Sequence, residues 1–173
     1  MNKLKLLIVE GNTKEENVNF NIAGCVPQSQ NFKLHIKKLE PNSEIDVVEP
    51  TDDDSISKIL ASIKKYDGVV LTGSTLRLNE DIKEIKKHVE FAKICFQHEK
   101  KIFGACWGLQ VTVIAAGGKC RVAQNGPHIG IAHDIELIRT EKIIGCIQIN
   151  QINLQHLRLI MMKSKFHQNI QFY

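Results

Sequence analysis

The sequence predicts one α/β domain built on a mostly parallel β-sheet. The chain has 173 residues, of which 43% are hydrophobic and 24% charged, a composition typical of a globular protein with one sizeable core. Short apolar runs alternate with stretches whose apolar residues recur at helical spacing, over about 120 residues. This alternation indicates βαβ units, in which the crossovers are right-handed and the strands parallel.

The first strand is predicted over Leu4–Val9, a continuous apolar run that ends at Glu10. The polar segment Lys14–Phe20 is compatible with a short helix, whereas Gln28–Leu39 is ambiguous between a helix and a strand. A second strand is predicted over Glu44–Val48, which is rich in branched apolar residues.

A helix with clear capping residues and a third strand come next. The Thr, Asp and Ser side chains of Thr51–Ser55 can accept hydrogen bonds from the first free N–H groups of a helix. Gly68–Leu71 is a short apolar run that ends in the turn Thr72-Gly73-Ser74, as expected of a buried strand. The predicted core face of the helix consists of Ile56, Ile59, Leu60 and Ile63.

A long helix is predicted over roughly residues 80–98, and Asn79 is its expected cap. Its apolar residues recur with the period of a helix that covers one face of a sheet. The predicted core face consists of Ile82, Ile85, Val89, Ala92 and Phe96.

The elements after this helix are shorter. Ile102-Phe103 is predicted as a strand, and Leu109–Ala116 as a helix that stops at Gly117-Gly118. Two further short strands are predicted near residues 119–123 and 129–137. In a sheet of this kind, sites lie at the carboxyl ends of the strands.

The segment Gly104-Ala105-Cys106-Trp107-Gly108 places a cysteine in a tight turn between a strand and a helix. Glycines are needed where a side chain would collide with neighbouring backbone. This is the arrangement of a nucleophile elbow with Cys in place of Ser, in which the N–H of the next residue can face a developing oxyanion. The helix N-terminus also favours a thiolate.

The other four cysteines are expected to be small residues of the core: Cys25, Cys95, Cys120 and Cys146.

Three blocks of sequence, in order, resemble class I (triad-type) glutamine amidotransferases, in particular the stand-alone, GMP-synthase-like subgroup. Residues 104–110 resemble the G-x-C-x-G-x-Q elbow, and residues 66–74 resemble the strand and oxyanion loop "YDGIILSGGP". Residues 115–119 and 126–132 resemble the "GG-x-V … EIG" stretch that follows. The resemblance covers approximately residues 1–141 and implies a flavodoxin-like fold of three layers.

The resemblance also implies a reaction. Cys106 would attack the side-chain amide of glutamine, giving a γ-glutamyl thioester and ammonia, and water would then release glutamate. The backbone of Gly73, Ser74 and Trp107 would form the oxyanion hole, and Gln110 would help to hold the substrate. Ser74 stands where the family often has a second glycine. Glutamine is then the small-molecule substrate, while the ammonia acceptor and any synthetase partner stay open.

The family activates its cysteine with a His-x-Glu motif carried late in the domain, and no such motif follows Cys106. A Cys–His pair could use another histidine, with His156 or His167 as candidates, but the sequence selects none. Two alternatives therefore stay open: a γ-glutamyl peptidase or hydrolase with the same thioester chemistry, and a non-catalytic pseudo-enzyme or truncated product. The histidines after Cys106 are His128, His133, His156 and His167.

Residues 143–173 are expected to be an atypical basic tail after an incomplete amidotransferase-like domain, residues 1–142. Because Met has a single codon, Met161-Met162-Lys163 read from the third base of each codon gives Asp-Glu. The residues around this pair can then be chosen to resemble the "SHxDEV" block of the family. We therefore expect a shifted reading frame and a C-terminally truncated domain, which the DNA sequence tests.

The charge distribution bears on partners and location. Residues from Lys142 to Tyr173 include four of the 23 basic residues and none of the 19 acidic ones, so the body is formally neutral. Residues 1–141, without net charge, lack the excess of basic residues that is typical of nucleic-acid-binding proteins. No run approaches the roughly 18 apolar residues of a membrane span. Scattered cysteines, five in number, fit a reducing cytoplasm. Without a P-loop, GxGxxG or HExxH string, no metal or other cofactor is expected.

Overall fold

The computed structural model describes residues 3–51, 53–78, 82–120 and 170–171. The chain divides into two compact units, Met1–Gly118 and Lys119–Tyr173. The second unit contains the antiparallel pair β5 (Lys119–Cys120) and β6 (Ile170–Gln171). β5 covers the start of the strand predicted near 119–123, whereas the strand predicted near 129–137 and the boundary predicted at 142 lie outside the described residues.

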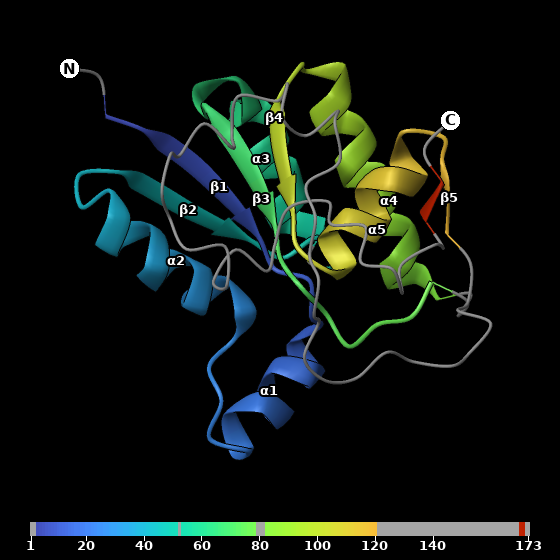
Figure 1. Ribbon diagram of the computed structural model, residues 1–173, viewed down its shortest axis with the longest axis horizontal. Coiled ribbons are helices and arrows are strands. Elements are labelled where there is room, and N and C mark those ends of the chain that lie inside the picture. The colour runs from blue at the N-terminus through green and yellow to red at the C-terminus, as the bar shows by residue number, and fades with distance from the viewer. Residues whose placement is uncertain (1–2, 52, 79–81, 121–169, 172–173) are drawn as a thin grey trace, which may run out of the picture. The chain divides into compact units, whose positions relative to one another are not determined.

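The first unit is built on a four-stranded sheet in which every pair is parallel, in the order β2-β1-β3-β4 (Figure 1). Its strands are β1 (Lys5–Val9), β2 (Glu44–Val48), β3 (Gly68–Leu71) and β4 (Lys101–Gly104). All four lie where the apolar runs predicted them. The order reverses between β1 and β3, so this point of the sheet, at the carboxyl ends, is where a site is expected.

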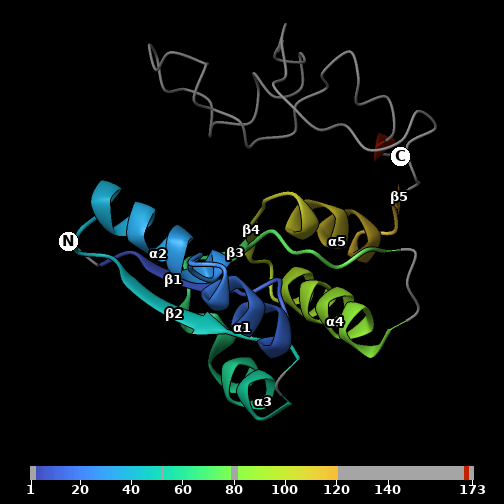
Figure 2. The ribbon, with the colours of Figure 1, turned by 90° about the horizontal axis from the view of Figure 1, so that it is seen from below.

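Helices cover both sides of this sheet, which makes three layers. α2 (Gln28–Leu39) and α5 (Trp107–Ala115) lie on one side, and α3 (Asp53–Ser62) and α4 (Lys83–Gln97) lie on the other (Figure 2). A single 3-10 turn, Ile63–Lys65, follows α3. The predicted α/β, flavodoxin-like architecture is therefore confirmed.

α2 settles the ambiguous segment as a helix. Phe32 and Ile36, four residues apart, are both half-buried, whereas Leu34 between them is exposed. The Phe32 ring lies 6.4 Å from the ring of Phe103 in β4, centroid to centroid. An i, i+4 pair on one face is helical periodicity, and a strand would instead have placed Leu34 beside Ile36.

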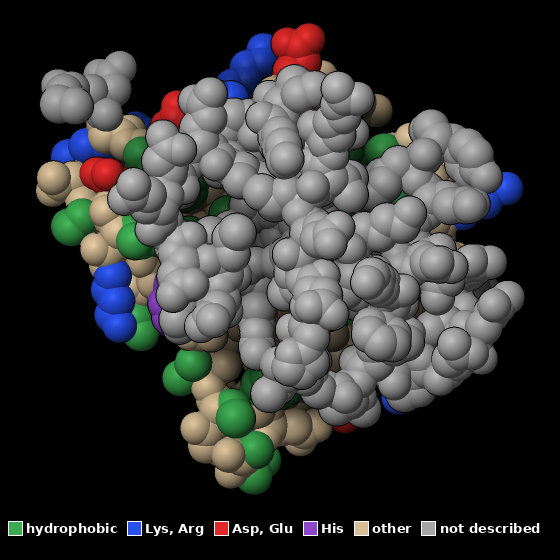
Figure 3. All heavy atoms as spheres, in the orientation of Figure 1, with side chains coloured by type: hydrophobic (Ala, Val, Ile, Leu, Met, Phe, Trp, Pro, Cys, Tyr) green, Lys and Arg blue, Asp and Glu red, His purple; other side chains and the backbone are tan. Residues whose placement is uncertain are grey.

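α1 (Lys14–Ile22) begins with a capping box. The Thr13 hydroxyl accepts a hydrogen bond from the Glu16 N–H at 3.2 Å, and the Glu16 carboxylate accepts one from the Thr13 N–H at 2.7 Å. The helix follows the carboxyl end of β1, and hydrophobic side chains gather over it at the bottom of Figure 3. Val18 and Ile22 are among its exposed residues.

α4 differs from its prediction in its start and in one residue of its core face, whereas Ile85 and Ala92 are buried as predicted. It begins at Lys83, with Ile82 at the N-cap position and no side-chain cap, and Asn79 lies outside the described residues. Phe96, predicted to be in the core, is 39% exposed, while Phe91 is buried. The buried residues of the helix are Ile85, His88, Phe91, Ala92 and Cys95. Within the described part of the chain, no helix has the length and apolar character to span a membrane.

Candidate active site

Cys106 lies in the turn between β4 and α5, with φ 51° and ψ −105°. It is one of two described non-glycine residues with positive φ, a backbone conformation that L-residues adopt only when the surroundings hold them in it. The residue is exposed and occupies the N-cap position of α5, which begins two residues earlier than predicted. These are the features of the nucleophile elbow that the sequence predicts.

The elbow depends on two glycines because backbones meet there. A Cβ on Gly104 would lie 2.7 Å from backbone atoms of Gly108 and Leu109. A Cβ on Gly108 would lie 2.2 Å from the carbonyl oxygen of Leu71 in β3. Both distances are too short for any side chain, so the pattern Gly-x-Cys-x-Gly follows from the packing of α5 against its own turn and against β3.

Three loops meet at the carboxyl ends of the strands. The Thr72 N–H donates to the Val9 carbonyl at 3.1 Å, and the Gly108 N–H donates to the Thr72 carbonyl at 3.0 Å. These bonds extend the alignment of β1, β3 and β4 into their loops. A Cβ built on Gly73 would lie 3.9 Å from Cβ of Cys106, so the loop after β3 passes directly beside the candidate nucleophile.

A polar network that extends from buried Glu10 and Asn12 to exposed Thr75 orders the loop after β3. Asn12 accepts a hydrogen bond from the Thr75 N–H at 3.2 Å, and the Thr75 hydroxyl donates to the Glu16 carboxylate. The Glu10 carboxylate is fully buried and accepts hydrogen bonds from the N–H groups of Asn12 at 3.1 Å and Ser29 at 2.9 Å. Because these bonds cross between loops, they fix the loop that carries Gly73 relative to β1 and α1.

The predicted site residues lie on two of these loops and on α5. Gly73 and Ser74 are half-buried, and the Ser74 hydroxyl accepts a hydrogen bond from the Leu76 N–H at 3.1 Å. Trp107 is buried at the start of α5, and the N–H of half-buried Gln110 donates to the Cys106 carbonyl at 3.2 Å. The loop glycine and the cysteine are thus neighbours, while the roles assigned to these residues stay predictions.

The described cysteines are all free thiols with different surroundings. Burial raises the pKa of Cys95 to about 12 and also raises the pKa of half-buried Cys120. Cys25 is exposed after α1, so its prediction as a core residue is wrong. It lies in the segment between α1 and α2, where its neighbour Val26 is exposed as well. Cys146 lies outside the described residues.

His88, which lies before Cys106 in the chain, was not predicted from the sequence to be near the site. His88-Val89-Glu90 is itself a His-x-Glu string, but it lies on α4 and Glu90 is exposed. His88 is 2% exposed, and its Nδ1 accepts a hydrogen bond from the Trp107 indole N–H at 3.1 Å. The sequence carried a signal for its burial alone, since His88 lies three residues from both Ile85 and Phe91 on the buried face of α4.

Burial lowers the pKa of His88 to about 4, because the charged imidazolium is poorly solvated in the core. The backbone of Glu10 and the carboxylates of Glu16 and Glu84 oppose this shift without offsetting it. The imidazole is therefore neutral near pH 7.

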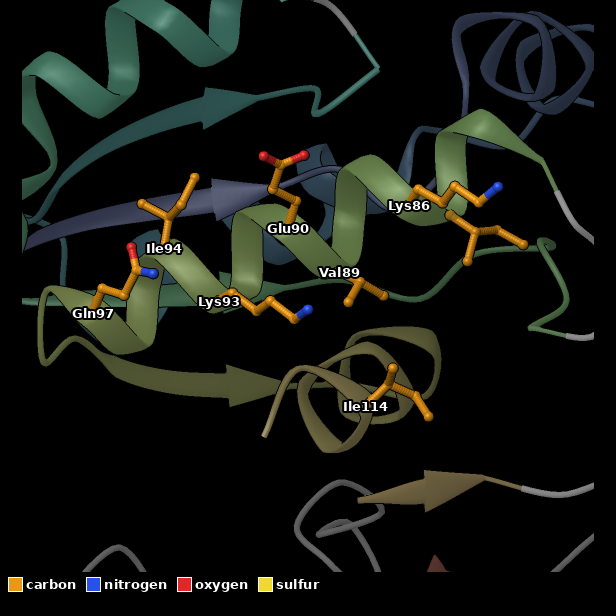
Figure 4. A pocket seen from close by; sticks show the side chains of 8 residues that line it. Lys86, Val89, Glu90, Lys93, Ile94, Gln97 and Ile114 are labelled. Carbon is orange, nitrogen blue, oxygen red and sulfur yellow. The ribbon is translucent and has the colours of Figure 1, made fainter. Parts of the chain in front are cut away.

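A groove of about 680 Å³ lies between α4 and α5 (Figure 4). None of the predicted site residues lines it. Lys93 and Val89 point from α4 toward Ile114 of α5, and Glu90 points away from them. The groove is lined by Ile85, Lys86, Val89, Glu90, Lys93, Ile94, Gln97 and Ile114.

The chain is similar in sequence to known proteins over most of its length. The profile of the family "Glutamine amidotransferase class-I" matches residues 28–166. The γ-glutamyl-L-1-hydroxyisopropylamide hydrolase of a Pseudomonas species is 32% identical over 141 residues, which cover 79% of this chain and 47% of that protein. The γ-glutamyl peptidase 2 of Arabidopsis thaliana is 34% identical over 74 residues, which cover 41% of this chain and 29% of that protein.

Among solved structures, a proposed GMP synthase component of Thermoplasma acidophilum matches with a TM-score of 0.48 and 17% identity, over 75% of this chain and 53% of that one. The chain spans about half the length of its Pseudomonas relative and less than a third of the Arabidopsis one. The family profile nevertheless matches well over half of the sequence and includes the elbow. This chain therefore belongs to the class-I glutamine amidotransferase family.

Proposed function

We propose that this chain hydrolyses the γ-amide of glutamine, with Cys106 as the nucleophile. The observation that carries the proposal is the conformation of Cys106, an exposed thiol held at positive φ between β4 and α5, directly beside Gly73. Membership of the amidotransferase family supports the same chemistry.

The proposed reaction has two steps. The Cys106 sulfur attacks the γ-carbonyl carbon of glutamine, the C–N bond breaks, and the nitrogen leaves as ammonia after it has taken up a proton. Water then adds to the γ-glutamyl thioester, the C–S bond breaks, and glutamate and the free thiol are formed. Each step passes through a tetrahedral intermediate with a negative oxygen.

The backbone N–H groups of Gly73, Ser74 and Trp107 are proposed to stabilise this oxyanion, and Gln110 to help hold the substrate. The close approach of Gly73 to Cys106 supports the first part. Trp107 is the first residue of α5, where N–H groups have no partner within the helix. The half-buried position of Gln110, one turn into α5, supports the second part.

A second candidate is a γ-glutamyl peptidase or hydrolase, in which an amine leaves in place of ammonia. The names of the Pseudomonas and Arabidopsis relatives favour this candidate. The covalent chemistry at Cys106 is the same, so the two functions differ in the group attached to the γ-nitrogen. Which synthetase or acceptor would use the ammonia depends on this distinction.

The general base is a separate proposal. Among the described residues none forms a hydrogen bond with the Cys106 thiol, and all histidines after Cys106 lie outside the described residues. We propose His156 or His167 as the general base, and replacing each of them by Asn tests this. Cys106-dependent hydrolysis that survives both changes would exclude them as the base.

We also propose a cytoplasmic location, supported by the free thiols at the four described cysteines. No nucleic-acid or membrane partner is proposed.

The experiment is glutamate release from glutamine and from a γ-glutamyl alkylamide by the full chain. Cys106→Ala removes the nucleophile, and we expect it to lower hydrolysis of the preferred substrate by about 10³-fold or more. Cys25→Ala is the matched control, since it also removes an exposed thiol, and should leave the rate unchanged. Release that persists in Cys106→Ala would refute the assignment, and a chain that cleaves neither substrate would support the non-catalytic alternative.

A further inference from the structure

The hydrogen bond between His88 and Trp107 joins α4 to the residue that follows the nucleophile. The indole N–H of Trp107 donates to Nδ1 of His88 at 3.1 Å, and the two rings meet edge to face with centroids 5.8 Å apart. Both side chains are buried to 2% exposure. Trp107 is also the single tryptophan of the sequence.

The other ring nitrogen shows what this histidine contributes. An indole can only donate, so Nδ1 must be the acceptor and the proton of the neutral ring lies on Nε2. Nε2 is buried and has no hydrogen-bond partner in the part of the chain that the structure describes. A buried, unpaired N–H destabilises a protein, and an apolar side chain would avoid this loss. The group that His88 supplies and an apolar residue lacks is the acceptor Nδ1.

The peptide between Cys106 and Trp107 comes directly after the unfavourable φ and ψ angles of Cys106. Such backbone persists only where the surroundings fix it. The Gly108 N–H is held by the Thr72 carbonyl at 3.0 Å and by the Ala105 carbonyl at 2.9 Å. The side chain of Trp107 is held by His88. A backbone contact and a side-chain contact therefore fix the two residues that follow Cys106.

We propose that His88 is a positioning residue that fixes the Trp107 ring through Nδ1 and thereby holds the Cys106–Trp107 peptide in the elbow conformation. The consequence for hydrolysis rests on the proposed function, because it assumes that Cys106 attacks and that the Trp107 N–H faces the oxyanion. His88 is not the general base in this proposal. Its Nδ1 is occupied by the indole, and no described contact joins Nε2 to the thiol.

The protonation state agrees with this role. Burial lowers the pKa of His88 to about 4, so Nδ1 keeps its lone pair at neutral pH. The acidic groups that act on the ring are Glu16 of α1 and Glu84 of α4, together with the backbone of Glu10 after β1.

Two substitutions separate the acceptor from the bulk of the ring. In His88→Asn the side-chain oxygen is attached to Cγ, as Nδ1 is in histidine, so Asn can still accept from Trp107. His88→Leu fills similar space without an acceptor. Trp107→Phe removes the donor, and in that background His88→Leu should cause no further loss.

The first measurement is the rate at which iodoacetamide alkylates Cys106, with exposed Cys25 of the same molecule as the internal reference. Because a fixed elbow holds the thiol at the N-terminus of α5, we expect His88→Leu to lower the Cys106 rate about threefold or more. His88→Asn should stay within about twofold of the unchanged chain. Acid quenching of Trp107 fluorescence, with a midpoint near pH 4, should disappear in both variants.

The second measurement is steady-state hydrolysis, in which His88→Leu should lower kcat about tenfold with KM unchanged and His88→Asn should restore most of it. Equal alkylation rates in His88→Leu and the unchanged chain would overturn the proposal, as would an Asn variant as slow as Leu. If the unchanged chain hydrolyses nothing while alkylation responds as expected, the proposed function fails and this inference stands. If His88→Leu does not fold, His88→Asn and the Trp107→Phe background decide the outcome.

Discussion

At Gly108 the first turn of α5 lies against the backbone of β3, and the missing side chain is what allows the contact. A Cβ there would lie 2.2 Å from the Leu71 carbonyl oxygen, and backbone cannot move aside as a flexible side chain can. We expect Gly108→Ala to lower the free energy of unfolding by roughly 2–3 kcal/mol, measured by urea denaturation.

Gly24 is the matched control for this substitution. Its φ of +75° favours glycine, but no atom lies within 4 Å of the position that a Cβ would occupy. Gly24→Ala should therefore cost about 1 kcal/mol, from backbone conformation alone. If the two alanine variants were equally stable, the close contact at Gly108 would not be what requires glycine there.

The chemistry of the elbow could be predicted because it is local in sequence. Gly104, Cys106 and Gly108 lie within five residues, and close backbone contacts require glycine at Gly104, within the turn, and at Gly108, against β3. His88 could not be found in the same way. Its contact with Trp107 spans 19 positions and exists only once α4 and α5 are packed, so no spacing rule connects the two residues.

Among the elements, strands were predicted more accurately than helix faces. A strand buried on both faces is a continuous apolar run, as Gly68–Leu71 is, and its bounds follow directly from the sequence. α4 carries apolar residues on more than one face, because Ile94 lines the groove while Phe91 packs into the core. Periodicity alone placed Ile85 and Ala92 correctly in the core, but it did not distinguish buried Phe91 from exposed Phe96.

Which face of α4 packs into the core can be tested with its two phenylalanines. Phe91 is 1% exposed, so Phe91→Ala should leave a cavity and lower the free energy of unfolding by about 3–5 kcal/mol. Phe96, five residues later on the same helix, is 39% exposed, and Phe96→Ala should cost less than about 1 kcal/mol. Thermal and urea unfolding of both variants measure the difference. A larger loss at Phe96 would restore the core face predicted from the sequence.

For the molecule as a whole, the core determines how buried ionisable groups respond to pH. One hydrophobic cluster joins the sheet, α4 and α5, with Leu7, Phe91, Cys95 and Trp107 among its members. We therefore expect the first unit to unfold cooperatively, so that its buried ionisable groups become exposed to solvent in one transition. The raised pKa of Cys95, about 12 against 9.0, then implies that stability falls as the pH rises above about 9.

At acid pH the same reasoning applies to His88, whose charged form is the protonated imidazolium. Its pKa is about 4 in the folded protein and 6.5 in the unfolded chain, so between these values the unfolded chain binds a proton that the folded protein does not. The free energy of unfolding should therefore fall as the pH drops from about 6.5 to 4, by about 3 kcal/mol in total. The lowered pKa of Asp46 acts only below its ordinary value of 3.8, outside this window. Urea unfolding at several pH values measures the loss, and His88→Asn, which cannot titrate, should remove most of it. An equally steep loss in His88→Asn would show that other groups cause the acid sensitivity.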